Sequence, residues 1–232
     1  MRAESARRNL PVIPRRQDMQ TSSLTHRELL SDLQRLRREM KKIEAELDAT
    51  RVKEANARHL ATHDMLTGIP NQRYFRGRLE QLLHPGPLPP PVLALLYIDL
   101  NGFKAINDTL GHAMGDQLLR AAAQRLKHAI RKDDIICRLG GDEFGCLLVG
   151  IEDRRQIVRV ATKAVRALGA PLRLGKLQCP ISASIGIARS PTDHATPEGL
   201  MQRADTAMYF AKKQRIAYAF CSDVRATLAK QT

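Results

Sequence analysis

Two adjacent glycines, Gly140 and Gly141, separate two short apolar runs in the middle of the chain, and no other feature constrains the fold as strongly. The runs are residues 135–137 before the pair and residues 144–149 after it. Glycine tolerates the positive backbone φ angle that a tight turn between strands requires. An apolar run, a glycine pair and a second apolar run therefore predict a β-hairpin, in which two antiparallel strands are neighbours in a sheet.

Acidic residues follow the glycine pair directly, at Asp142 and Glu143. A further acid, Asp99, ends the apolar run 92–98, which has the pattern of a strand buried on both faces. Three carboxylates that share one edge of a sheet repel each other unless a cation neutralises them. Because oxygen ligands favour Mg²⁺ or Mn²⁺, and Mg²⁺ commonly also binds substrate phosphates, this set predicts two-metal phosphoryl or nucleotidyl transfer.

The remaining elements alternate between helical and extended patterns, so the sheet cannot be purely parallel. We expect an α+β fold with a central, mostly antiparallel sheet flanked by helices. This domain is expected to span residues 61–222, followed by a C-terminal tail, residues 223–232. Helices are predicted at 71–83, 115–130, 153–168 and 196–213, and strands at 92–99, 178–188 and 216–220.

The N-terminal part differs in composition from the rest of the chain. Residues 1–23 are polar and basic and contain Pro11 and Pro14, which predicts disorder. Residues 24–60 lack proline and glycine, and their apolar side chains recur at alternating spacings of four and three. This spacing predicts a coiled-coil helix and a parallel homodimer, the alternative being a single helix packed on its own domain. The seam consists of Leu29, Leu33, Leu36, Met40, Ile43 and Leu47.

The formal net charge of +14 favours an anionic ligand, which can be a phosphate-rich small molecule, a nucleic acid or a membrane surface. The sequence has no zinc-finger spacing and no pattern of interleaved basic and aromatic residues, so we expect no specific nucleic-acid partner. No apolar run reaches the length of a membrane span. The four cysteines form no C-x-x-C pair and no secretory signal precedes them, so a cytoplasmic location with reduced thiols is expected.

Several motifs occur in one order along the chain, and together they resemble a known family. They are His-Asp-Met-Leu-Thr-Gly-Ile-Pro-Asn-Gln-Arg at 63–73, the segment 99–108, Gly-His-Ala-Met-Gly-Asp at 111–116, Arg-Leu-Gly-Gly-Asp-Glu-Phe at 138–144, and segments 184–188 and 204–212. The chain from residue 61 onward resembles the GGDEF domain of bacterial diguanylate cyclases. It departs from that family's pattern at Gln72, where arginine is usual, and after Lys212, where the family has Lys-x-x-Gly-Arg-Asn.

The resemblance implies a reaction and a set of metal ligands. The family condenses two GTP molecules into cyclic di-GMP and releases two pyrophosphates, with one GTP bound by each domain of a homodimer. The resemblance implies that Asp99 and Asp142 bind two Mg²⁺ (or Mn²⁺) ions per active site, together with the backbone carbonyl of Leu100. Glu143 is implied as a metal ligand or as the base that removes the proton of the ribose 3′-hydroxyl.

The resemblance also implies how the nucleotide is held. Asn107 and Asp116 would read the guanine, because a carboxylate accepts hydrogen bonds from the N1 and N2 donors that adenine lacks. This favours GTP over ATP. The phosphates would be held by the backbone N–H groups of Gly102, Phe103 and Lys104 and by the side chains of Lys212 and Arg215.

A second site is implied by Arg131 and Asp134, which form an R-x-x-D pattern five residues before Gly140. In the family this placement marks the site where cyclic di-GMP binds and inhibits the enzyme. Arginine can bind a guanine edge or a phosphate, and aspartate accepts from guanine donors. A further arginine is expected to complete the site, and the sequence does not choose among Arg154, Arg155, Arg159 and Arg166.

Three functions from different classes follow. The first is an active, product-inhibited diguanylate cyclase. The second is a non-catalytic cyclic di-GMP receptor that uses only Arg131 and Asp134. The third is a protein that binds nucleic acid non-specifically through its positive charge. The complete set of Asp99, Asp142 and Glu143 favours the first.

Overall fold

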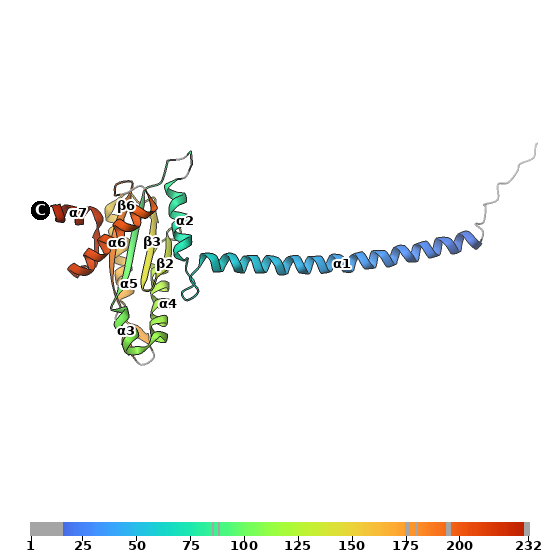
Figure 1. Ribbon diagram of the computed structural model, residues 1–232, viewed down its shortest axis with the longest axis horizontal. Helices are drawn as coiled ribbons and strands as arrows, with labels where there is room; N and C mark the ends of the chain where they lie inside the picture. The colour runs from blue at the N-terminus through green and yellow to red at the C-terminus, as the bar shows by residue number, and fades with distance from the viewer. Residues whose placement is uncertain are drawn as a thin grey trace, which may run out of the picture. The chain divides into compact units, whose positions relative to one another are not determined.

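The computed structural model has two parts, drawn in Figure 1. The chain divides into two compact units, Met1–Asn56 and Ala57–Thr232, and each is described by itself. Disorder was expected for residues 1–23; residues 1–15 fall outside the part of the chain that the structure describes, and residues 16–23 are helical. The described residues are 16–84, 86–87, 89–174, 177–179, 181–193 and 196–229.

The N-terminal unit is formed by helix α1 (Arg16–Thr62). It begins before residue 24, where the sequence analysis placed the start of the coiled coil, because no proline or glycine occurs between Pro14 and Gly68 to interrupt it. The apolar seam is exposed within this chain, with Leu29 65% and Ile43 63% accessible. An exposed stripe of this kind is what a partner helix would cover, and the homodimer remains a prediction.

The second unit is built on a five-stranded sheet with the strand order β2-β3-β1-β6-β7. β2 and β3 form the predicted hairpin, and β1 pairs with β3 on one side and β6 on the other, all antiparallel. The pair β6–β7 is parallel. The predicted α+β fold with a mostly antiparallel sheet is thereby confirmed. The strands are β1 (Leu93–Asn101), β2 (Ile135–Gly140), β3 (Glu143–Val149), β6 (Ser182–Ser190) and β7 (Tyr218–Phe220).

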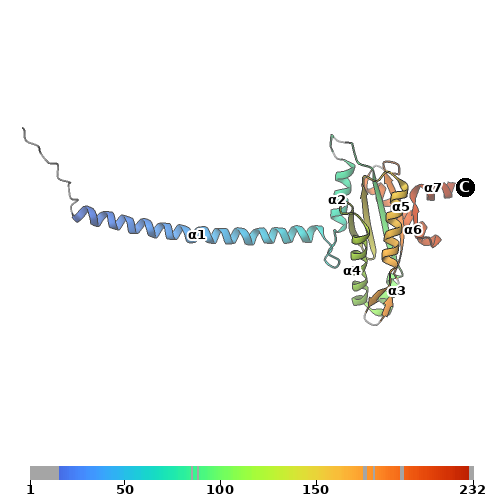
Figure 2. The same ribbon diagram turned by 180° about the vertical axis from the view of Figure 1, so that it is seen from behind.

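Helices cover both faces of the sheet, which Figures 1 and 2 show from opposite sides. Leu96 and Ile98 of β1 point into the cluster under α4 and α5, whereas Leu93 and Leu95 point into the cluster under α2 and α6. This alternation explains why β1 reads as a continuous apolar run. The helices are α2 (Gln72–Leu83), α4 (His112–Ala129), α5 (Arg154–Gly169) and α6 (Pro197–Gln214).

Helix α6 approaches the sheet most closely at Gly186 of β6. A Cβ atom at this position would lie 1.9 Å from the carbonyl oxygen of Ala204 and 2.2 Å from the backbone nitrogen of Met208. Only glycine allows this approach, and it brings the last turns of α6 over the ends of β1 and β6.

Four short elements were not predicted. The expected strand 178–188 is divided into β5 and β6, and α3 was missed because it buries none of its residues and so lacks a long apolar stripe. Helix α7 occupies most of the expected tail and is held by an ion pair of 2.6 Å between Arg225 and Asp193. The four elements that were not predicted are α3 (Phe103–Leu110), β4 (Leu172–Leu174), β5 (Leu177–Cys179) and α7 (Cys221–Ala229).

None of the helices in the described residues is both long and apolar enough to cross a membrane.

Candidate active site

The three predicted acids meet at one edge of the sheet. Asp99 of β1 and Glu143 of β3 are direct cross-strand partners, so their side chains leave the same face of the sheet. Between them, the backbone nitrogen of Leu100 donates a hydrogen bond of 3.3 Å to the carbonyl oxygen of Asp142. The turn that carries Asp142 is closed by Gly141 with φ of 49°.

Helix α6 adds a cation to this edge. The Nζ atom of Lys212 lies 2.7 Å from Oδ1 of Asp99, whose side chain is 11% exposed. Asp205 lies two helical turns earlier on the same face of α6; it belongs to the motif segment 204–212, but the sequence analysis gave it no role in the site. Burial and the charge of Asp99 raise the pKa of the Asp205 carboxyl above its usual value. Burial chiefly, and also Asp99, raise the pKa of Asp142, whereas Lys212 and Arg138 act to lower it.

The residue types at this edge, carboxylates and a backbone carbonyl oxygen, are those that divalent cations such as Mg²⁺ prefer. Asp142 and Asp205 both have raised pKa values partly because of Asp99, so the site carries negative charge that its own cations do not fully offset. The positive charge that neighbours Asp99 in this structure is the ammonium group of Lys212, which donates a hydrogen bond to its carboxylate. In the arrangement observed, no three His, Cys, Asp or Glu side chains among the described residues converge closely enough to hold a metal together.

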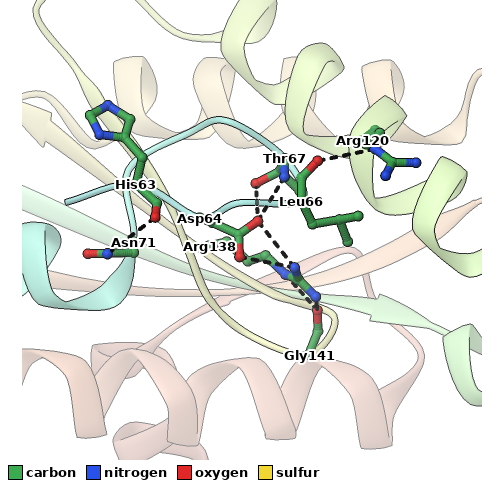
Figure 3. A network of polar contacts seen from close by, with 8 residues as sticks. All are labelled: His63, Asp64, Leu66, Thr67, Asn71, Arg120, Arg138 and Gly141. Carbon is green, nitrogen blue, oxygen red and sulfur yellow. Dashed lines mark hydrogen bonds and ion pairs between the residues drawn. The ribbon is translucent and has the colours of Figure 1, made fainter. Parts of the chain in front are cut away.

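The turn is fastened to the loop after α1 by Arg138, as Figure 3 shows. Its guanidinium donates to both carboxylate oxygens of Asp64 at 3.2 and 3.1 Å, and to the carbonyl oxygen of Gly141 at 2.7 and 3.0 Å. Asp64 also accepts from the backbone and hydroxyl of Thr67. Burial alone would raise the pKa of Asp64, but these hydrogen bonds outweigh it and lower the pKa.

The two residues predicted to read guanine are brought together where α3 meets α4. The side chain of Asn107 packs against Gly115, where a Cβ atom would lie 1.9 Å from its Oδ1 atom. Asp116 follows Gly115 directly and is half-buried. The Oδ1 atom of Asn107 is buried, yet no hydrogen-bond donor reaches it from the described part of the chain. A buried acceptor without a donor is energetically costly.

The segment predicted to hold phosphates is the loop that leads from β1 into α3. Gly102 adopts the left-handed conformation with φ of 76° and caps α3, which starts at Phe103. The first N–H groups of a helix, here those of Phe103 and Lys104, have no acceptor within the helix and face a ligand or solvent. The loop follows Asp99 and Leu100 by two or three residues, so these N–H groups lie beside the acidic edge.

Arg215 and Lys212 line a cavity of about 460 Å³ together with Asn101, Ser182 and Ser184. Arg215 is the residue that ends α6 in the left-handed conformation, with φ of 55°. This is the position that glycine usually occupies, because a side chain costs about 1 kcal/mol there. The segment after Lys212, which departs from the family's pattern, therefore makes a left-handed turn without a glycine, and the side chain at that turn is the guanidinium of Arg215.

Arg131 and Asp134 line a second, larger cavity of about 990 Å³, whose wall also includes Tyr74, Arg78 and Lys127. The carboxylate of Asp134 accepts from the backbone nitrogen of Arg131 at 3.0 Å, which fixes it in place. The additional arginine at this cavity comes from α2, and the wall includes none of the four arginines considered from the sequence (Arg154, Arg155, Arg159 and Arg166). α5 carries those four, and Arg154 lies instead over the ring of Phe220 at 3.8 Å.

Comparison with known proteins adds independent evidence. The family model described as diguanylate cyclase, GGDEF domain, matches residues 61–216. Diguanylate cyclase TpbB of Pseudomonas aeruginosa is 42% identical over 161 residues, which cover 69% of this chain and 37% of that protein. The chain thus spans little more than a third of this curated relative's length.

Two solved structures share the fold. The GGDEF domain of TpbB from Pseudomonas aeruginosa is 41% identical, with a TM-score of 0.63, over 68% of this chain and 91% of that one. The coiled coil and GGDEF domain of DgcB from Caulobacter crescentus, in complex with c-di-GMP, has a TM-score of 0.73. It covers 80% of this chain and 98% of that one at 23% identity, so it supports the fold alone.

Proposed function

This chain belongs to the GGDEF domain family of diguanylate cyclases, and on that premise we propose that it condenses two GTP molecules into cyclic di-GMP. The observation that carries the proposal is the cross-strand pairing of Asp99 with Glu143, beside the turn of Asp142. Glu143 and Asp142 are 44 and 43 residues from Asp99 in the sequence, and the antiparallel pairing of β1 with β3 brings them to the same edge of the sheet. The relative TpbB, at 42% identity, is named a diguanylate cyclase.

The nucleobase would bind between α3 and α4. Asn107 contributes the buried Oδ1 acceptor that lacks a donor, and the adjacent Asp116 contributes a carboxylate. Guanine presents N1–H and N2–H donors to two such acceptors, whereas adenine has no hydrogen on N1 and no amino group at C2. A site with buried acceptors discriminates strongly against a ligand that leaves them unpaired, so GTP is the proposed substrate.

Asp99, Asp142, Glu143 and the carbonyl oxygen of Leu100 are the residues that would hold divalent cations. When bound, Mg²⁺ or Mn²⁺ would neutralise the triphosphate and make the ribose 3′-hydroxyl more acidic. The chain's own residues do the rest. Lys212 would leave Asp99 and pair with a phosphate, as would Arg215 from the adjoining cavity, while N–H groups at the start of α3 hold the triphosphate.

The chemistry needs two chains. Glu143 of one domain would accept the proton of the 3′-hydroxyl, and that oxygen attacks the α-phosphorus of the GTP held by a second domain. A new P–O bond forms, the bond from the α-phosphorus to the bridging oxygen breaks, and pyrophosphate leaves. Catalysis is then largely a matter of positioning two domains face to face. The exposed seam of α1 supports a homodimer as the means.

Product regulation is proposed for the cavity lined by Arg131 and Asp134. Its wall places the cations Arg78, Arg131 and Lys127 around a carboxylate, a combination that suits phosphates together with a guanine edge. Its volume of about 990 Å³ is ample for a dinucleotide. Cyclic di-GMP bound there would favour an arrangement of domains in which the two GTP sites do not meet.

The same cavity favours one alternative, a receptor that binds cyclic di-GMP without making it. Incubation of the purified protein with GTP and Mg²⁺, followed by chromatography of the nucleotides, separates the two. We expect cyclic di-GMP and pyrophosphate to form and to disappear in Asp142→Ala and Glu143→Gln. If the parent forms no product at micromolar enzyme yet binds cyclic di-GMP, the receptor is correct and the cyclase proposal is not.

A further inference from the structure

Tyr97 of β1 lies beside the acidic edge and has no role in the reaction outlined above. Its hydroxyl donates a hydrogen bond of 2.9 Å to Oε2 of Glu143, a residue 46 positions away in the chain. We infer that Tyr97 is a positioning residue, which holds the Glu143 carboxylate in the orientation that the reaction needs. The inference rests on the proposed function and adds to it a residue outside the GGDEF turn.

The sheet explains how the phenol reaches this acid. Side chains alternate along a strand, so Tyr97 and Asp99 leave the same face of β1. The residues directly opposite Tyr97 are Gly145 on β3 and Gly186 on β6, so neither neighbour presents a side chain. The Phe75 ring and Cys137 lie over Gly145 and the backbone of α6 lies over Gly186, so these groups flank the Tyr97 ring. Glu143 lies on the diagonal, two residues before Gly145, which is within reach of an aromatic side chain.

The direction of this hydrogen bond follows from the two groups that form it. A carboxylate can only accept, so the phenol hydroxyl of Tyr97 is the donor.

The contact has a consequence for how Glu143 acts. One of its oxygens, Oε2, is engaged by the phenol, and the other remains available to a metal or to a 3′-hydroxyl. Glu143 is the first residue of β3, next to the turn, and is only partly buried. The hydrogen bond from Tyr97 restricts the rotamers of this partly exposed side chain. Losing a single positioning bond of this kind lowers a rate by roughly tenfold.

The test compares Tyr97→Phe with Tyr218→Phe. Both remove one phenol hydroxyl from a partly buried tyrosine of the same sheet, but Tyr218 packs edge-to-face on Phe220 in β7. We expect kcat of Tyr97→Phe to fall roughly tenfold while its KM for GTP stays within about twofold, because the hydroxyl acts on Glu143 and not on the nucleotide. Tyr218→Phe should retain the parent's kcat. A Tyr97→Phe enzyme with the parent's kcat overturns the inference.

A second measurement does not depend on turnover. Thermal midpoints of the parent, Tyr97→Phe, Glu143→Ala and the double variant form a cycle, and the two single effects should not add if the side chains are in contact. Additive midpoints overturn the inference. An inactive parent would instead refute the proposed function, and the cycle still decides whether Tyr97 holds Glu143.

Discussion

Arg138 and Asp64 form an ion pair of 3.1 Å, although 74 residues separate them in the chain. Because the same guanidinium donates to the carbonyl of Gly141, the loop that follows α1 is tied to the turn that carries Asp142. Asp64 lies two residues beyond the end of α1 at Thr62. The pair is partly buried, with 15% and 22% of the two side chains exposed, so it is screened less than a surface pair.

Replacing Asp64 by Asn should destabilise the domain in a pH-dependent way. The pKa of Asp64 is lowered in the folded protein, so its contribution to stability is present above its ordinary value of 3.8 and is lost as the pH falls through the lower folded value. We expect the thermal midpoint of Asp64→Asn to lie below the parent's at pH 7, with a gap that narrows below about pH 4. A gap that is constant from pH 7 to pH 3 would contradict this origin.

Replacing Asp116 by Ala should weaken discrimination between purine nucleotides. The change removes the proposed acceptor for guanine's N1–H and N2–H, so KM for GTP should rise by on the order of tenfold or more, while binding of ATP changes little. Steady-state kinetics and ATP competition measure both. Asp108→Ala, an exposed acid on α3, is the matched control and should behave as the parent. Equal losses for GTP and ATP would show that Asp116 does not read the base.

Replacing Arg78 by Ala should relieve inhibition by cyclic di-GMP without lowering the initial rate. Arg78 lines the cavity with Arg131 and Asp134 and lies away from the acidic edge. We expect the concentration for half-inhibition to rise about tenfold, the usual effect of losing one charged hydrogen bond. Arg76→Ala, an exposed arginine on the same helix, should leave inhibition unchanged. An unaltered inhibition curve for Arg78→Ala would show that cyclic di-GMP does not bind through Arg78 of α2.

Replacing both Leu36 and Met40 by Glu should disrupt the homodimer. The two side chains are 52% and 60% exposed within one chain and lie four residues apart on the predicted seam. Charges at such positions oppose pairing. Light scattering should report a monomer at concentrations where the parent is a dimer, and specific activity should fall with dilution. Lys41→Glu, off the seam, is the control; a dimeric Leu36→Glu, Met40→Glu variant would rule out this interface.

Much of the fold could be predicted because its signals are local. The glycine pair between apolar runs indicated the hairpin, and the caps Asn71, Asp153 and Thr196 stand where the helices that follow them begin. Local signals failed where the element is short or exposed, as in α3, and where the chain ends, as in α7. The candidate acids were predicted from their residue types, and the sheet brings Asp99 and Glu143 together as expected.

Contacts between segments far apart in the chain could not be predicted in this way. From the sequence, four arginines of α5 were considered as the partner of Arg131, but the second arginine in the wall of the cavity that Arg131 lines is Arg78, because α2 and not α5 lies beside that cavity. Asp205 lies in the motif segment 204–212 and Tyr97 precedes Asp99 by two residues, but neither was given a role in the site from the sequence. Their importance follows from what faces them across the sheet and from α6.

The sequence by itself determined the chemistry that is available: which acids, amides and cations the chain carries, and the helices and hairpin that short-range spacing specifies. Tertiary structure alone decided which of these groups meet. Strand register paired Asp99 with Glu143 and placed Tyr97 diagonally across from Glu143, where its hydroxyl reaches the carboxylate. The physical reason is that propensity and periodicity act over a few residues, whereas a hydrogen bond between strands depends on the packing of the whole domain.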